Sequence, residues 1–204
     1  MSKIDELIQE LCPDGVEYLP FGDFVSMQTG QQLNRSKLSD SGTYPVMNGG
    51  IFASGYWDEY NIDENTIIAS QGGAFAGFVN FMTSKFWAGA HCFVIKIIDD
   101  RIVNKYAYYF LKNMQDDIQN AKLGAGIPGL NKKELQSLEI PIPPLPIQRQ
   151  IVAILDKFDA LVNDISAGLL AEIEARQKQY EYYRNQLLAF PCPPTGEAEL
   201  KAAA

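Results

Sequence analysis

Four polar segments of this chain carry side chains of the types that form paired hydrogen bonds with planar ligands. The richest segment is 28–37, and the others are 47–50, 70–73 and 122–133. Glutamine and asparagine match the hydrogen-bonding edge of adenine, arginine matches that of guanine, and lysine suits phosphate. On this chemistry we select ten candidate contacts to nucleic acid: Gln31, Gln32, Asn34, Arg35, Lys37, Asn48, Gln71, Lys85, Lys122 and Lys132. Because the surface loops of any protein are polar, the composition favours base contact but does not establish it.

The last of these segments also contains a glycine motif. Gly124, Gly126 and Gly129 match the G-x-G-x-x-G spacing of dinucleotide-binding loops. They follow a predicted helix, whereas a dinucleotide loop follows a strand, and Pro128 lacks the N–H group that the phosphate turn uses. The pattern therefore does not favour a dinucleotide site. The lysines around these glycines could hold a backbone phosphate, and a flexible connector between helices explains the glycines equally well.

Other catalytic and metal-binding patterns are missing from the sequence. His91 is the only histidine, and the apolar, strand-like run around it suggests a core residue rather than a base. Cys12, Cys92 and Cys192 lack the spacing of metal ligands, so we interpret them as reduced thiols. Nucleophile elbows, Walker loops, HExxH motifs and the Asn-Pro-Pro-Tyr type of tetrad that holds a flipped adenine are absent. We expect no catalytic residues, no metal ion and no cofactor.

The elements that would position the polar loops change along the chain. Residues 2–11 have the periodicity of a short helix, with Ser2 as its N-cap, and 104–120 return to helical periodicity. Between about 16 and 98, short β-prone runs alternate with glycine, asparagine, serine and aspartate, which is typical of a mostly antiparallel sheet with long loops. A further short helix is predicted after Asn131, with Glu134 at its third position.

A long amphipathic stretch, 146–190, follows this part of the chain. Its apolar residues recur every three or four positions, which predicts one helix of roughly 65 Å at ~1.5 Å per residue. The rhythm slips after Ile165, and Gly168 predicts a kink or a close helix contact. A helix this long outruns a small domain, so we expect much of its stripe to meet another helix. The predicted interface residues are Ile151, Ile154, Phe158, Leu161, Ile165, Leu169, Ile173, Tyr180, Tyr183 and Leu187. A plain dimerisation coiled coil would explain the stripe without further function.

The predicted fold class is therefore α+β. A mostly antiparallel β domain with short helices occupies 1–145, one long coiled-coil-forming helix occupies 146–190, and a disordered tail occupies 191–204. Composition is that of an ordinary globular chain, with 47% apolar and 21% charged residues. No run is apolar enough to enter a membrane and no signal peptide begins the chain, so we expect a cytoplasmic protein. The net charge of -8 repels phosphate and counts against DNA binding by the chain on its own.

At this point the sequence resembles a known family. The run IPIPPLPIQRQIVAILDKFDALV and the later EIEARQKQYEYYRNQLLAF resemble the conserved region of specificity (S) subunits of type I restriction-modification enzymes. The segments LCPDGVEY, YPVMNGGIFASGYWDEYN, SQGGAFAGFVN and GAGIPGLNKKELQSLEIPIPPL are similar to the target recognition domain of that family. The similarity covers nearly everything from about 7 to 190.

The resemblance implies a DNA-recognition role without catalysis. A full S subunit has two target recognition domains separated by two long antiparallel helices, and it binds modification subunits that methylate adenine and restriction subunits that cut DNA. This chain has one such domain and one long helical stretch, so it resembles a half-size S subunit. We expect it to pair with a second copy as an antiparallel homodimer that reads a bipartite site in double-stranded DNA. Base-reading residues vary within the family and are not implied by the resemblance. The alternatives are a dimeric coiled-coil scaffold that does not read DNA, and an enzyme with cryptic activity.

Overall fold

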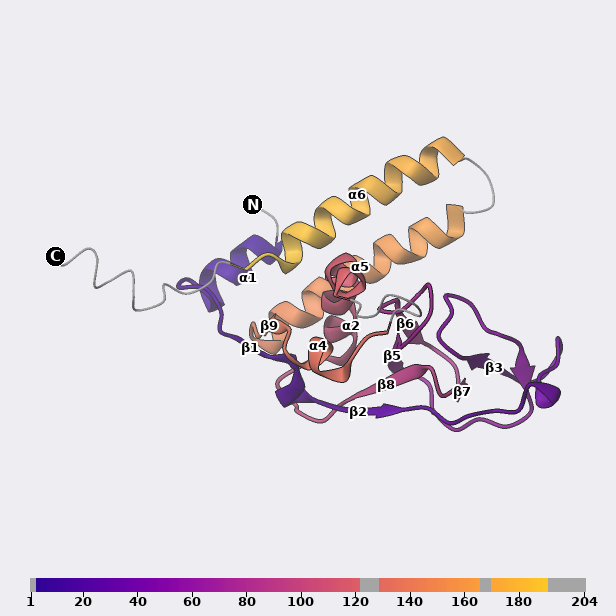
Figure 1. Ribbon diagram of the computed structural model, residues 1–204. Coiled ribbons are helices and arrows are strands. Elements are labelled where there is room, and N and C mark those ends of the chain that lie inside the picture. Colours follow the sequence, from indigo (N-terminus) through magenta and orange to yellow (C-terminus); the bar gives the residue numbers. More distant parts are fainter. Residues whose placement is uncertain (1–2, 122–128, 166–169, 191–204) are drawn as a thin grey trace. The chain divides into compact units, whose positions relative to one another are not determined.

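The computed structural model describes residues 3–121, 129–165 and 170–190; the side chains of Lys3 and of 163–173 are also outside the description (Figure 1). The fold divides into two compact units. The helical unit comprises 1–19, 101–109 and 139–204, and the sheet unit comprises 20–100 and 110–138. The expected division at residue 145 therefore differs from this one, since the N-terminal segment groups with the long helices. The predicted helix over 2–11 is observed as α1 (Lys3–Leu11), whereas Ser2 and the tail 191–204 lie outside the described residues.

The sheet unit is built on four antiparallel strands in the order β2-β8-β5-β6. These are β2 (Val25–Thr29), β8 (Cys92–Ile97), β5 (Thr66–Ser70) and β6 (Val79–Met82). Every residue of β5 is buried, because its β-branched and small side chains pack on both faces of the sheet. Each of these strands was predicted from its β-prone run.

A second, three-stranded sheet has the order β4-β3-β7 and belongs to the same unit. Its strands are β4 (Tyr56–Trp57), β3 (Tyr44–Met47) and β7 (Trp87–Ala88). β3 pairs antiparallel with β4 but parallel with β7, which is consistent with the expectation of a mostly antiparallel domain. The two sheets share a core cluster that includes Met47, Ile68, Phe86 and Val94. Burial of these apolar side chains is the main force that fixes both sheets.

The short helices revise two predictions. The predicted helix 104–120 is observed as α2 (Asn104–Asn113) and α3 (Gln115–Asn120), with the break at Met114. The short helix after Asn131 is observed as α4 (Lys132–Gln136), but the Asn131 side chain does not cap it; the Glu134 N–H group bonds to the Asn131 carbonyl instead. Two 3-10 turns, η1 (Phe21–Phe24) and η2 (Arg35–Lys37), flank β2 and the loop that follows it.

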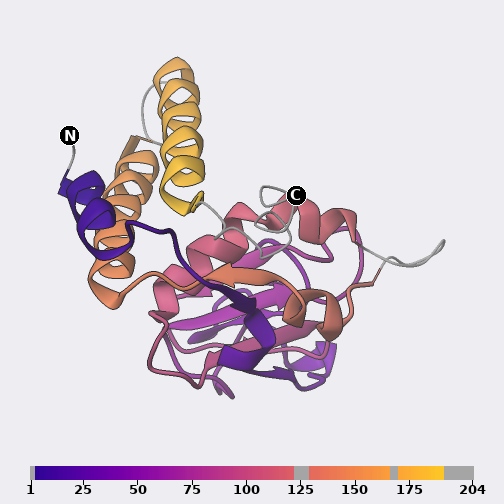
Figure 2. The same ribbon diagram turned by 90° about the vertical axis from the view of Figure 1, so that its left-hand side faces the viewer.

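The helical unit contains the main correction to the sequence analysis. The stretch 146–190 is not one rod: α5 (Leu145–Ile165) and α6 (Leu170–Leu188) lie side by side and antiparallel, as both views show (Figures 1 and 2). The phenyl rings of Phe158 and Tyr183 stack with centroids 5.4 Å apart. The apolar stripe is therefore covered, in part, by the other half of the same stretch. The predicted kink at Gly168 falls outside the described residues.

Hydrogen bonds of one buried glutamine fix the start of α5. Gln148 is fully buried, and its side chain accepts a hydrogen bond from the Val103 N–H group at 2.8 Å. It also donates to the carbonyls of Arg101 and Pro143, both at 2.8 Å. Beside it, Ile147 and Ile151 are fully buried, so the first turns of α5 form the core of this unit.

The short strands β1 (Tyr18–Pro20) and β9 (Glu139–Pro141) pair with each other.

Candidate nucleic-acid interface

The register of the main sheet brings the predicted polar loops to one edge. Thr29, the last residue of β2, pairs with Phe93, and Ser70, the last residue of β5, pairs with Cys92 at the start of β8. The loops after β2 and β5 therefore leave the sheet beside the turn that precedes β8. The loop after β3 begins at the same place, because Met47 pairs with Ala88.

His91 lies at the junction of these loops. Its N–H group donates to the Asn48 side-chain oxygen at 3.2 Å, and its carbonyl accepts from the Gln71 N–H group at 2.9 Å. Gly49, at φ +84°, packs against His91: a Cβ atom at this position would lie 3.1 Å from the His91 carbonyl oxygen. The interpretation of His91 as a core residue is wrong: the residue is exposed, because the apolar run begins only at Cys92.

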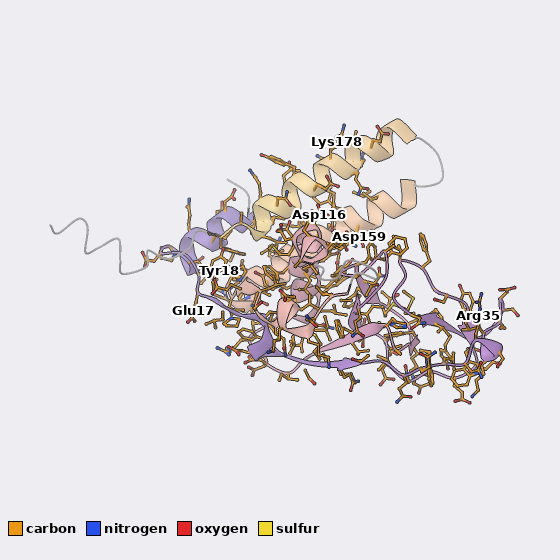
Figure 3. The ribbon with its side chains drawn as sticks, viewed as in Figure 1. Glu17, Tyr18, Arg35, Asp116, Asp159 and Lys178 are labelled. Atoms are coloured by element: carbon orange, nitrogen blue, oxygen red, sulfur yellow. The ribbon has the colours of Figure 1, made fainter. Side chains whose placement is uncertain are left out.

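One surface depression collects the first group of predicted residues. It is lined by Gln32, Leu33, Asn34, Arg35, Leu38, Asn48 and Ser54. The Asn34 side chain accepts a hydrogen bond from the Ser36 N–H group at 3.1 Å and so caps the turn η2 that carries Arg35. Arg35 itself is exposed at an outer end of the sheet unit (Figure 3). Asn34 is thus placed to orient Arg35, whose guanidinium could pair with a guanine edge.

A second depression collects Gln71 and Lys132 from the prediction, together with Thr29, Phe93, Asn131 and Lys133. The Lys132 ammonium donates to the Met27 carbonyl at 3.1 Å and lies 5.9 Å from the centre of the Phe93 ring. The Gln71 carbonyl accepts from the Leu130 N–H group, which ties the loop before α4 to the loop after β5. Gln31 lies between the two depressions in sequence and is exposed, with its N–H group bonded to the Ala88 carbonyl at 2.8 Å.

Two further lysines of the prediction, Lys85 and Lys37, line neither depression. Lys85 follows β6 at the opposite edge of the main sheet, where Met82 pairs with Thr66. Its ammonium donates to the Tyr60 hydroxyl at 3.0 Å and lies 3.7 Å from Asp63, and the contact with Tyr60 raises the pKa of Lys85. Lys37 lies over the Trp57 ring, 4.7 Å from its centre. Lys122 is outside the described residues.

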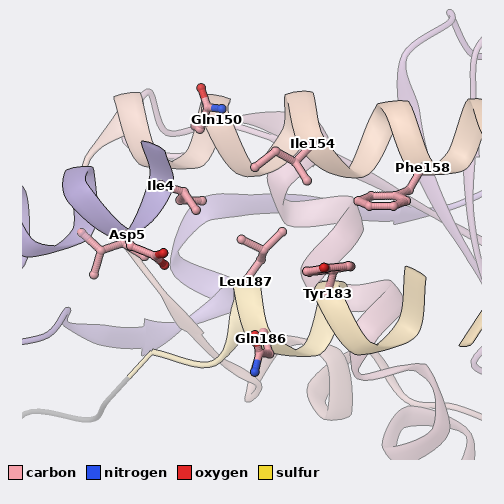
Figure 4. Close-up of a pocket in the computed structure, with 9 residues that line it drawn as sticks. Ile4, Asp5, Gln150, Ile154, Phe158, Tyr183, Gln186 and Leu187 are labelled. Atoms are coloured by element: carbon pink, nitrogen blue, oxygen red, sulfur yellow. The ribbon is translucent and has the colours of Figure 1, made fainter. Parts of the chain in front are cut away.

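The predicted interface residues of the long stretch have several environments. Ile151 is fully buried in the chain's own core, and Leu161 and Tyr183 stay 42% and 39% exposed. A groove of about 370 Å³ separates α1, α5 and α6, and it is lined by Ile4, Asp5, Ile8, Gln150, Ile154, Phe158, Tyr183, Gln186 and Leu187 (Figure 4). Tyr180 is half-buried, and burial raises its pKa to about 12. The side chains of Ile165, Leu169 and Ile173 are outside the description.

The described part of this sheet edge presents hydrogen-bonding and cationic groups. Within the described residues, no three His, Cys, Asp or Glu side chains gather where they could hold a metal ion. Cys92 is buried, which raises the pKa of its thiol to about 12. Each described helix is too short or too polar to cross a bilayer. What the sheet edge can do is donate and accept hydrogen bonds over an extended surface, as a base-reading surface does.

Comparison with known proteins assigns the family. The model of the type I restriction modification DNA specificity domain matches residues 13–175. The chain belongs to this specificity-domain family. The specificity subunit of the EcoR124I/EcoR124II type I restriction enzyme of Escherichia coli is 47% identical over 98 residues, 47% of this chain and 24% of that protein. A putative type I specificity subunit of Mycoplasma pneumoniae is 31% identical over 172 residues, 81% of this chain and 55% of that protein.

A solved structure supports the same assignment. The crystal structure of the type I restriction-modification system S subunit from M. genitalium superposes with a TM-score of 0.69 and 26% identity, over 74% of this chain and 41% of that one. Its fold class agrees with the α+β prediction. The specificity-domain chain thus spans about half, or less, of the length of these relatives.

Proposed function

We propose that this chain is the DNA-recognition component of a type I restriction-modification system, with no catalytic step of its own. The observation that carries the proposal is the convergence of the loops after β2, β3 and β5 around His91. Loops far apart in sequence bring amide and guanidinium groups to one edge, where the Lys132 ammonium of α4 also lies. The methyl transfer and the cutting of DNA then belong to separate modification and restriction subunits that this chain recruits.

DNA binding is expected to depend on assembly with the modification subunits. The chain carries a net charge of -8, so phosphate repulsion keeps the affinity of the isolated chain low at physiological salt. In fluorescence anisotropy, the assembly is expected to prefer its own site over a scrambled duplex by a factor on the order of 10³ or more. An assembly that forms but shows no sequence preference would favour the scaffold alternative. Tight specific binding by the isolated chain would contradict the dependence on assembly.

The second part of the proposal is an antiparallel pair of chains that holds two recognition units apart. Phe158 stacks on Tyr183, and one turn away Ile154 and Leu187 point toward each other across the groove (Figure 4). If α5 and α6 separate, the same antiparallel register can form between α5 of one chain and α6 of another, as in domain swapping. The exposed Leu161 and Tyr183 would then gain cover from the second chain.

Sedimentation tests this pairing. We expect a species of about 45 kDa at micromolar concentration, twice the 22.7 kDa of one chain. Leu161→Glu places a charge on the exposed part of α5 and is expected to yield monomers with unchanged circular dichroism. Lys157→Glu, a charge change on the same helix at an exposed position, is the matched control and should stay dimeric. A wild-type monomer at tens of micromolar would leave the hairpin as the functional state and end the pairing proposal.

A further inference from the structure

The loop between β3 and β4 carries an exposed aromatic ring that the recognition chemistry above does not use. Phe52 is 82% exposed, the highest value among the large apolar side chains in the described part of the chain. Single exposed apolar side chains are common on protein surfaces, so the position in which this ring is held and the groups that surround it decide what it can contact.

Hydrogen bonds tie down the backbone on both sides of Phe52. The Asn80 side chain donates to the Ile51 carbonyl at 3.1 Å. On the other side, the Ser54 N–H group bonds to the Val46 carbonyl at 2.8 Å, and the Val46 N–H group bonds to the Gly55 carbonyl at 2.9 Å. The residues on both sides of Phe52 are therefore tied to the sheet unit while the ring projects.

The surroundings of the ring are polar, which decides the chemistry of the partner. Asn48 and Ser54, near the two ends of the loop, line the same depression as Gln32 and Arg35. A protein partner would call for an apolar patch around the ring. A base step offers a flat apolar face bordered by hydrogen-bonding edges and phosphates, which matches a single ring among amides and a guanidinium.

We propose that Phe52 is a wedge that inserts its ring against a base step of the duplex at the recognition site. The insertion partly unstacks that step and kinks the DNA. This inference rests on the proposed recognition function and adds a second mode of reading, through the ease of deforming one step. Sequence preference at that step then arises without a hydrogen bond from the protein.

The test uses the complete assembly with modification subunits and duplexes carrying 2-aminopurine at successive positions of the site. The wild-type assembly is expected to raise the fluorescence at one step. Phe52→Ala should remove that signal and weaken binding by roughly 5–150-fold, the range for loss of one base-stacking contact. Phe52→Trp should keep the signal, and an abasic duplex at that step should restore the affinity of Phe52→Ala.

Ile98→Ala is the matched control. Ile98 is also exposed, at 66%, but it follows the other end of β8, where its N–H group bonds to the Phe24 carbonyl. The Ile98→Ala substitution should change neither the 2-aminopurine fluorescence nor the affinity for DNA. Unchanged fluorescence and affinity in Phe52→Ala would overturn the wedge. A variant that assembles poorly with the modification subunits, but binds DNA normally once assembled, would also overturn it, because Phe52 would then contact a protein subunit. If the wild-type assembly has no sequence preference, the recognition proposal itself fails. If Phe52→Ala keeps the full preference at the step where the wild type raises the fluorescence, the wedge alone is overturned.

Discussion

Replacing Gln148 with leucine is expected to lower the free energy of unfolding by about 3 kcal/mol, because three backbone groups lose a hydrogen bond worth about 1 kcal/mol each. The Gln148 side chain is fully buried and leucine is similar in size, so the substitution leaves no large cavity that would add to the destabilisation. For a chain of this length the melting temperature should fall by roughly 6–12 °C. Thermal unfolding followed by circular dichroism measures the change.

Gln150→Leu provides the control for that result. It makes the same chemical change two residues along α5, at a half-buried position that lines the groove of Figure 4. Its melting temperature should stay within a few degrees of wild type. A change of 1 kcal/mol in the free energy of unfolding shifts the melting temperature of a chain this long by about 2–4 °C. Equal losses in the two variants would show that the bonds to Val103, Arg101 and Pro143 do not hold the start of α5 in place.

Arg35→Ala is expected to relax the choice of one base pair in the site. A guanidinium paired with a guanine edge contributes about 1–3 kcal/mol of discrimination, so the preference at that position should fall roughly 5–150-fold. We expect Arg35 to reach a base because its side chain is exposed on a turn that Asn34 caps. Competition binding of the assembly against duplexes that differ at single positions measures the loss.

Lys37→Ala, two residues along the same turn, should behave differently. Lys37 is predicted to meet phosphate, so its loss should weaken binding to all duplexes alike and reduce the salt slope by about 1. If Arg35→Ala gave this uniform pattern instead, the guanidinium would be a backbone contact, and the assignment of base reading to the first depression would be wrong.

The four strands of the main sheet were predictable because each lies in a short β-prone run bounded by turn residues. The convergence of the loops was not, since it depends on the strand order that places β8 between β2 and β5. The sequence of a strand and its neighbouring loops does not show which other strand it pairs with, and so which loops come together. For the same reason His91 was misread: the apolar run places it in a strand, whereas its backbone joins two loops at the end of that strand.

The long helical stretch shows the limit of periodicity. The spacing places Ile147 and Ile151 on an apolar face, and both are buried. Periodicity does not say which helix covers that face. Here α6 covers part of it, with Tyr183 on Phe158, so the expectation of one uninterrupted helix was wrong. Phe52 gave a weak signal in sequence, an aromatic residue directly after Asn-Gly-Gly-Ile, that was not selected.

The most direct measurement is a map of methylated bases in the DNA of cells that carry this chain together with its modification subunit. The account predicts methylation at one defined sequence that disappears when this chain is removed, and a change of that sequence at a single position with Arg35→Ala. Methylation at sites unrelated to the presence of this chain, or no sequence-defined methylation in cells where the assembly forms, would contradict the claim that the edge around His91 reads DNA.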